Sequence, residues 1–154
     1  MAKEIEHKFL VFPDLLPRPL SAGDHLKQGY LSCKPAVRVR IITSGRSSKA
    51  FLTIKGPGFR QRSEFEYEIP VNDAKSLMKL CGSRIVRKIR RRIGPWEIDE
   101  FKERHAGLWL AECELKSAKA KLPALPEWIG QEVTDDPEYS NSNLAICAIN
   151  SNPS

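Results

Sequence analysis

The chain has few of the residues that build histidine- or thiolate-based sites. Its four cysteines are scattered through 154 residues without a C-x-x-C pair, and His7, His25 and His105 lie far apart in the sequence. We therefore expect neither a zinc site nor a disulfide framework, and we expect the cysteines to be reduced thiols. A Ser-His-Asp triad has as little support.

Long apolar runs and targeting segments are also missing. No run approaches the roughly 20 apolar residues that cross a bilayer, and no basic segment followed by an apolar one opens the chain. We expect a cytoplasmic protein without a membrane partner. The Gly56-Pro57-Gly58 segment lacks the G-K-[ST] ending of a phosphate-binding P-loop. No linker, repeat or low-complexity tract divides the sequence, which predicts one domain over 1–154.

Positive charge is what the chain has in excess. The net charge of +6 suggests an anionic partner, which can be a nucleic acid, a phosphate-rich small molecule or an acidic surface. We do not expect a nucleic acid, because aromatic residues make up only 8% of the chain and many of its strand faces are rich in acids.

Alternation of apolar and polar residues dominates the chain and predicts β-strands. We expect strands at 3–11, 28–32, 36–42, 50–55, 62–69, 84–93, 96–101 and 108–115, and helical periodicity at 72–81 and 143–149. Short turns between successive strands favour an antiparallel sheet or barrel over alternating strands and helices. About eight strands suffice to close a barrel whose lumen holds side chains or one small ligand.

The polar faces of these strands carry almost only charged residues, often in like-signed pairs. Glu4/Glu6, Arg38/Arg40 and Glu112/Glu114 each occupy alternate positions, roughly 6.6–7 Å apart. Repulsion at that distance is about 0.6 kcal/mol in water but about 2.4 kcal/mol at an effective dielectric near 20. The pattern is tolerable on a solvated surface, which is the simpler interpretation. Inside a lumen it requires ligands of opposite charge.

The signs indicate what those ligands are. Carboxylates without nearby histidine or cysteine suit Mg²⁺ or Mn²⁺. Clusters of arginine and lysine suit phosphate oxygens. A lumen with both kinds of group describes a site for a metal–polyphosphate complex.

The sequence E-I-E-H-K at residues 4–8 matches the E-x-E-x-K hallmark of the CYTH superfamily, the triphosphate tunnel metalloenzymes. Further matches follow in the family's order: Q-G-Y at 28–30, R-x-R at 38–40, T-I-K-G at 53–56, R-x-E-x-E at 62–66, K-x-R at 88–90, W-E-I-D at 96–99 and E-x-E at 112–114. Nearly the whole chain resembles the short bacterial tripolyphosphatases of this family. The resemblance implies a mainly β fold, an eight-stranded antiparallel barrel, closed or partly open, with a few helices packed outside.

The resemblance also implies roles for the charged residues. The expected phosphate-binding residues are Lys8, Arg38, Arg40, Lys55, Arg62, Lys88 and Arg90. The expected metal ligands are Glu4, Glu6, Glu64, Glu66, Asp99, Glu112 and Glu114, with Glu4, Glu6 and Glu114 favoured. Lys55, Glu6 and Arg40 are the expected catalytic residues, with Lys55 a candidate for proton transfer.

We therefore expect a metal-dependent triphosphatase that uses Mg²⁺ or Mn²⁺ and removes a terminal phosphate. Inorganic tripolyphosphate is favoured because the sequence shows no aromatic-plus-amide pocket for a base. The alternatives are an adenylate cyclase of the same superfamily, a thiamine or nucleoside triphosphatase, and a non-enzymatic module that binds polyphosphate or nucleic acid. A homodimer is compatible with the resemblance.

Overall fold

The protein, in a computed structural model, is described over residues 2–58, 61–117 and 119–145, with the side chains of residues 2–4 excluded. The strands of this part are β1 (Ala2–Val11), β2 (Asp24–Cys33), β3 (Ala36–Ser44), β4 (Ser47–Lys55), β5 (Gln61–Ile69), β6 (Ile85–Ile93), β7 (Trp96–Phe101), β8 (Trp109–Glu114) and β9 (Ile129–Glu132). The α-helices are α1 (Val71–Leu80) and α2 (Asn141–Leu144), and short 3-10 turns occupy Pro13–Leu15, Glu103–His105 and Pro137–Tyr139.

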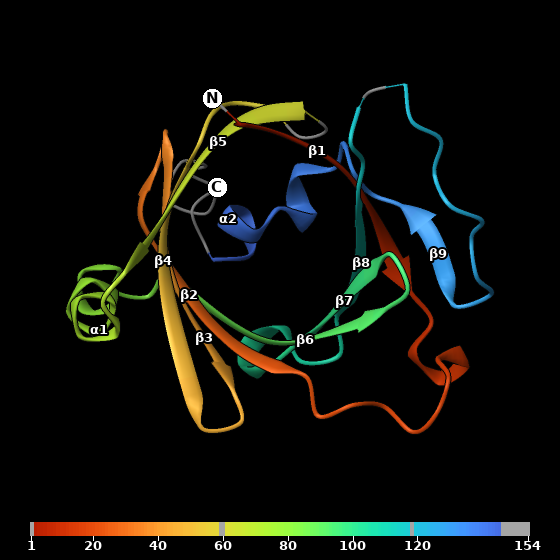
Figure 1. Cartoon of the computed structure of the whole chain (residues 1–154), viewed down its shortest axis with the longest axis horizontal. Coiled ribbons are helices and arrows are strands. Elements are labelled where there is room, and N and C mark those ends of the chain that lie inside the picture. The colour runs from red at the N-terminus through yellow and green to blue at the C-terminus, as the bar shows by residue number, and fades with distance from the viewer. Residues whose placement is uncertain (1, 59–60, 118, 146–154) are drawn as a thin grey trace, which may run out of the picture.

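The strands form a closed barrel. They follow the order β5-β4-β3-β2-β6-β7-β8-β1-β9, and β1 pairs with β5 as well, which joins the first eight into a ring (Figure 1). Neighbours in this ring are antiparallel. The predicted eight-stranded antiparallel barrel is therefore confirmed. The additional strand β9 pairs with the end of β1 and extends the sheet beyond the ring.

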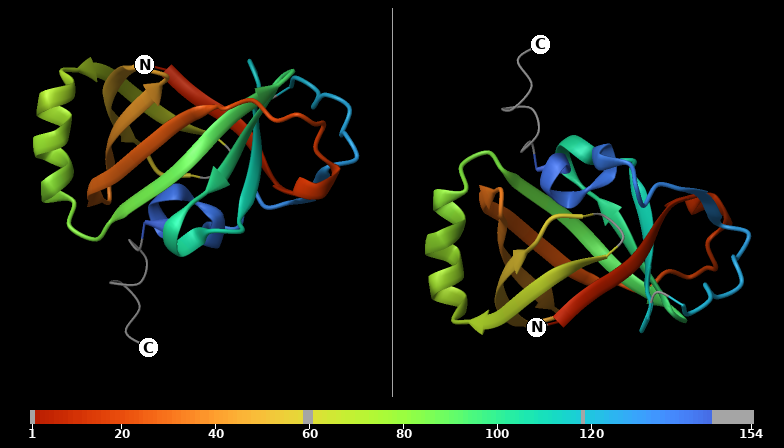
Figure 2. Two further views of the ribbon diagram at one scale, coloured as in Figure 1. Left: turned by 90° about the horizontal axis from the view of Figure 1, so that it is seen from below. Right: turned by 90° about the horizontal axis from the view of Figure 1, so that it is seen from above.

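Alternation along the strands separates a mostly apolar outer face from an inner face that carries most of the predicted charged residues. On one side of the barrel, Val39 and Ala50 pack outward against Ala74, Met78 and Cys81, which places α1 across the sheet. The helix lies close to β2, because a Cβ added to Gly29 would come within 2.7 Å of the Cys81 sulfur. Figure 2 shows α1 on the outside of the barrel.

A second apolar cluster covers the outer face of β1, β7 and β8. The rings of Phe9 and Trp96 lie edge to face with centroids 5.6 Å apart, and Trp96 contacts Trp128 in the same way at 6.1 Å. These contacts use the tryptophans as core residues, which leaves the charged side of the strands directed inward.

The C-terminal segment, by which we mean residues 134–145, covers one end of the barrel (Figures 1 and 2). Leu144 and Ala145 of this segment pack against inward-facing Tyr30, Phe101 and Leu110 in an apolar cluster. The lumen therefore has an apolar plug at one end, and its charged residues occupy the remaining part.

Some expectations about local structure are wrong. Strand β2 spans Asp24–Cys33 rather than 28–32, because pairing with β3 on one side and β6 on the other stabilises its polar first half. Helix α1 spans Val71–Leu80 rather than 72–81. The C-terminal helix covers Asn141–Leu144, and the rest of the range expected to be helical, 146–149, lies outside the described residues.

Cys33 is disulfide-bonded, so the expectation of four reduced thiols does not hold. No helix of the described ranges is long and apolar enough to pass through a membrane.

Candidate functional site

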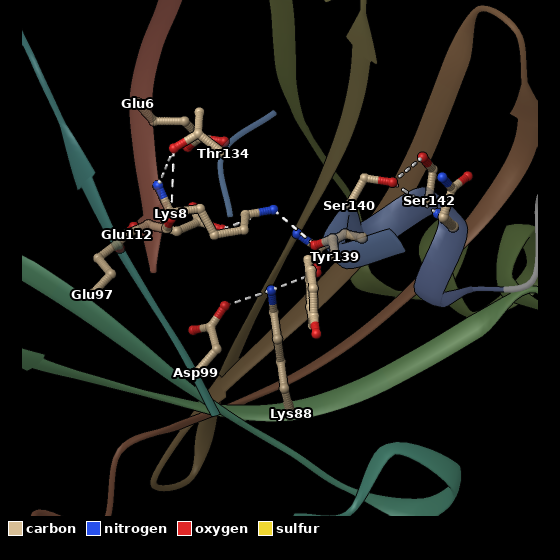
Figure 3. A network of polar contacts seen from close by, with 12 residues as sticks. Glu6, Lys8, Lys88, Glu97, Asp99, Glu112, Thr134, Tyr139, Ser140 and Ser142 are labelled. Carbon is tan, nitrogen blue, oxygen red and sulfur yellow. Dashed lines mark hydrogen bonds and ion pairs between the residues drawn. The ribbon is translucent and has the colours of Figure 1, made fainter. Parts of the chain in front are cut away.

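The inner face of the barrel brings the predicted charged residues into one lumen. Seven of them are buried: Glu6, Lys8, Arg38, Arg40, Lys88, Asp99 and Glu112. Arg62 and Arg90 are nearly as enclosed, with side chains 18% and 11% exposed. Residues from β1, β3, β5, β6, β7 and β8 therefore converge although they are spread over more than 100 positions of sequence. Figure 3 shows the acids and lysines of β1, β6, β7 and β8 directed into the lumen.

The most tightly bound group in the lumen is Asp99 with its two cations. Arg90 donates from Nε to Oδ1 at 2.8 Å and from Nη2 to Oδ2 at 2.9 Å, and Lys88 Nζ lies 2.6 Å from Oδ2. Burial alone would raise the pKa of Asp99, but Arg90 and Lys88 outweigh it and hold that pKa well below its usual range. Both carboxylate oxygens of Asp99 are therefore occupied by cations.

Lys88 is the most buried of these cations. It is 1% exposed and also donates to Asn141 Oδ1 at 3.0 Å, with the Phe101 ring 5.3 Å away. Burial lowers the pKa of Lys88 to about 7, and repulsion from Arg90 and Arg40 acts in the same direction, while Asp99 partly offsets both. A further anion beside Lys88 would therefore stabilise the charged form of its amine.

Arg38 and Arg40 on β3 form the next group of cations. Arg38 lies 3.8 Å from Glu66 and within 3.4 Å of Thr53 Oγ1, while Arg40 Nε donates to Gln28 Oε1 at 2.7 Å. Burial, with repulsion from Arg38 and Arg90, lowers the pKa of Arg40 to about 9, so its guanidinium is charged at neutral pH. No carboxylate of the described residues forms an ion pair with Arg40 within 4.0 Å.

Strand β1 contributes acid and base together. Glu6 Oε1 lies 3.7 Å from Arg62, and Lys8 Nζ lies 3.6 Å from Glu112 Oε1. Burial favours the neutral form of Glu112, but Lys8, Lys88 and Arg90 outweigh it and lower the pKa of Glu112 to about 2. Glu112 is therefore a carboxylate at any physiological pH.

Carboxylates also face each other across neighbouring strands. Glu6 pairs in register with Glu114, and Glu97 pairs with Glu112. Like charges directly opposite each other destabilise a sheet unless a cation lies between them. Facing carboxylates offer the hard oxygen ligands that Mg²⁺ and Mn²⁺ prefer, so the donor set fits such an ion. Within the described side chains, no three acidic, histidine or cysteine residues are already gathered as a metal site.

Some predicted site residues lie toward the margins. Glu66 and Glu114 are exposed, and Lys55 and Glu64 are half-buried cross-strand neighbours. The backbone of Glu4 pairs with Arg62, and its side chain lies outside the described residues. The structure thus brings the buried cations, Glu6, Asp99 and Glu112 together, and it places Glu66 and Glu114 where the lumen meets solvent.

The C-terminal segment lines two narrow cavities of the lumen. One is lined by Glu6, Lys8 and Thr134, the other by Arg38, Lys55 and Ser142, and both share Arg62 and Ser140. Lys8 Nζ also donates to the Tyr139 carbonyl at 3.0 Å (Figure 3).

No site role is predicted from the sequence for the neutral contacts Gln28, Thr53, Tyr139, Ser140 and Asn141, although Gln28 and Thr53 lie in two of the matched segments. Gln28 and Thr53 share the alternation of the charged residues, which is a usable signal. The contacts of Tyr139 and Asn141 depend on how the chain returns to the barrel, which no local pattern shows.

The fold and the site together define a class of protein: closed antiparallel barrels with a charged lumen. The family model described as the CYTH domain matches residues 2–143. The chain is 41% identical over 152 residues to an inorganic triphosphatase of Acetivibrio thermocellus, covering 94% of each chain. It is 36% identical over 154 residues to an inorganic triphosphatase of Nitrosomonas europaea, covering 93% of this chain and 97% of that one. A crystal structure of an inorganic triphosphatase superposes with a TM-score of 0.64 at 31% identity, covering 95% and 96% of the two chains.

The chain belongs to the CYTH family. The family membership that the sequence motifs predict is therefore confirmed over nearly the full length of the chain.

Proposed function

We propose that this protein is a metal-dependent triphosphatase that releases the terminal phosphate of inorganic tripolyphosphate. One observation carries the proposal: five cationic side chains, Lys8, Arg38, Arg40, Lys88 and Arg90, are enclosed in one lumen together with buried carboxylates. Burying several like charges is expensive unless anions accompany them. The acids of the lumen balance part of this charge, and a polyanion of phosphates supplies the rest. The two relatives named inorganic triphosphatase support the same activity.

The cations would bind and orient the phosphate chain. Arginine binds two phosphate oxygens at once, so Arg38 and Arg40 fit the role of fixing a phosphate against the wall formed by β2 and β3. Phosphate oxygens would replace the neutral acceptors Tyr139 and Asn141 on Lys8 and Lys88. Cations held in an enclosed site also stabilise the charge that develops in phosphoryl transfer.

The carboxylates Glu6 and Glu114, with Glu4, would hold a divalent cation, for which we propose Mg²⁺ or Mn²⁺. A bound divalent ion neutralises phosphate charge and activates water for attack on phosphorus. In this proposal Asp99 is a counterion, because its two oxygens already accept from Arg90 and Lys88. Lys55, beside Arg38 in the cavity lined by Ser142, stays the predicted proton-transfer residue.

The test is phosphate release across a substrate panel. We expect hydrolysis of tripolyphosphate with Mg²⁺ or Mn²⁺, and much slower turnover of ATP and thiamine triphosphate. Formation of cyclic AMP and pyrophosphate from ATP would instead identify a cyclase. Tight tripolyphosphate binding without turnover of any substrate would overturn the proposed activity and leave a binding module.

A further inference from the structure

Gln28 is a fully buried polar side chain in the cationic wall, by which we mean the inner face of β2 and β3 that carries Arg38 and Arg40. It lies on β2 in register with Arg40 on β3 and Val86 on β6, and its exposed fraction is 0%. Alternation directs it to the inner face, between the buried side chains of Leu26 and Tyr30 along the same strand. An uncharged amide therefore sits in the part of the lumen that is otherwise dominated by arginine.

One end of this amide is fixed by Arg40. Arg40 Nε donates to Gln28 Oε1 at 2.7 Å. A guanidinium has donors and no acceptor, so the oxygen of Gln28 must face Arg40 and the NH₂ group must point away from it. The contact thus determines both the orientation of Arg40 and the direction of the Gln28 donor.

The other end of the amide has no acceptor. Gln28 Nε2 is buried without a hydrogen-bond partner among the described residues, and the same holds for Arg38 Nε on the neighbouring strand. Buried donors are nearly always paired, so two unpaired donors on adjacent strands indicate an acceptor that binds between them. The neighbouring Arg40 and Arg38 are cations, which can only donate, so neither can accept from these two groups. The missing partner must be an acceptor with several oxygens, and phosphate has that chemistry.

A neutral donor has a physical advantage at this position. Arg40 already has its pKa lowered by burial and by repulsion from Arg38 and Arg90. A lysine or arginine in place of Gln28 would add to that repulsion. The amide supplies a hydrogen bond to an anion without adding charge to a crowded set of cations.

We propose that Gln28 is a substrate-contact residue of the lumen: Oε1 holds Arg40 in place and Nε2 donates to a phosphate oxygen of the bound triphosphate. This inference rests on the proposed function, because it assumes that the cationic wall binds phosphate. It adds a neutral donor to a set of proposed phosphate-binding residues that are otherwise all charged.

Steady-state kinetics on tripolyphosphate with Mg²⁺ provide the first test. Gln28→Met keeps the shape of the side chain and removes both polar atoms, and we expect KM to rise roughly tenfold to a hundredfold with kcat within about threefold. Gln28→Glu keeps an acceptor for Arg40 and loses the donor, so we expect a larger rise in KM without loss of thermal stability. Gln131→Met, the same change on exposed β9, is the matched control with unchanged KM. Wild-type KM in both Gln28 variants would overturn the inference.

Side-chain NMR of the wild-type protein provides the second test and does not depend on how the variants fold. The probe is diimidotriphosphate, a tripolyphosphate analogue with NH bridges, added with Mg²⁺. We expect the Gln28 amide and Arg40 Nε resonances to shift together at saturation. A shift of Arg40 without one of Gln28 would overturn this inference and leave the proposed function standing. No shift of either group would overturn both.

Discussion

Arg90 donates two parallel hydrogen bonds to the Asp99 carboxylate, and Lys88 Nζ lies 2.6 Å from Oδ2, one of the two oxygens that accept them. The pair is cross-strand: Arg90 on β6 lies in register with Asp99 on β7. A bidentate arginine–carboxylate contact is both strong and geometrically specific. Asp99 thereby fixes the positions of two buried cations that face the lumen. It organises the proposed phosphate-binding side of the site from within the barrel wall.

Replacement of Asp99 by asparagine should destabilise the empty protein. The change leaves Lys88 and Arg90 buried without their counterion, and breaking a buried ion pair typically costs about 3–5 kcal/mol. We expect the free energy of unfolding to fall by about that amount, measured by chemical denaturation without metal or substrate.

Glu100→Gln is the control for this change. Glu100 belongs to the same strand but faces outward, where it pairs with Arg91 and Lys102 in a partly exposed setting. Its loss should cost less than about 1 kcal/mol. If Asp99→Asn retains full stability and loses only its response to divalent cations, Asp99 is a metal ligand and its assignment as a counterion is wrong.

Acid should weaken the fold through Glu112. A carboxyl whose pKa is lowered on folding stabilises the protein above its unfolded pKa and loses that contribution as pH falls to the folded value. For Glu112 this window runs from 4.5 down to about 2, and its contribution at neutral pH is about 3 kcal/mol. Urea midpoints measured between pH 6 and pH 2.5 should therefore fall most steeply below pH 4.5. In Glu112→Gln the decline should be shallower, and an unchanged slope would contradict the role of Glu112.

The charged lumen follows from the sequence because alternation is a local property. Arg38 and Arg40 occupy one face of β3 whatever the strand pairs with, so their common direction is visible in A-V-R-V-R-I. The sequence does not show which group each of these charges contacts. Whether Asp99 meets a metal or Arg90 depends on the register between β6 and β7, which is set by a turn and by packing elsewhere.

Elements stabilised by distant partners escape local prediction for the same reason. Strand β9 is four residues with a glycine and no alternation, and it exists through pairing with β1 some 120 positions earlier. The first half of β2 is polar and becomes a strand between β3 and β6. Gln28 and Asn141 carry no charge, so an interpretation built on charge alternation passes over them although they contact Arg40 and Lys88.

The carboxylates of β1 and β8 should control the response to metal. Glu6 and Glu114 lie opposite each other, and a divalent cation between them would relieve their repulsion. We expect Glu6→Gln or Glu114→Gln to raise the Mg²⁺ concentration at half-maximal activity and to reduce activity at limiting Mg²⁺ at least tenfold. Glu68→Gln, on exposed β5, should leave the Mg²⁺ response unchanged. Wild-type behaviour of Glu6→Gln at limiting Mg²⁺ would show that the metal assignment is wrong.

The C-terminal segment should compete with substrate for the lumen lysines. Asn141 Oδ1 accepts from Lys88 Nζ at 3.0 Å, and this neutral acceptor is weak enough for a phosphate oxygen to replace. Asn141→Asp places a carboxylate at the same point, which should raise the pKa of Lys88 and hold it more strongly. We expect KM for tripolyphosphate to rise about tenfold in Asn141→Asp, because the phosphate must displace a charged acceptor and is also repelled by it.

Asn141→Ala separates this competition from a supporting role. If phosphate replaces Asn141 on Lys88, removing the amide should leave KM unchanged or lower it, because one competitor for the Lys88 amine is gone. Asn143→Ala controls for loosening of the segment, because Asn143 lies in the same short helix but its side chain donates a hydrogen bond to the Pro137 carbonyl. If Asn141→Ala and Asn141→Asp raise KM equally, Asn141 helps to bind the substrate, and phosphate does not displace it from Lys88.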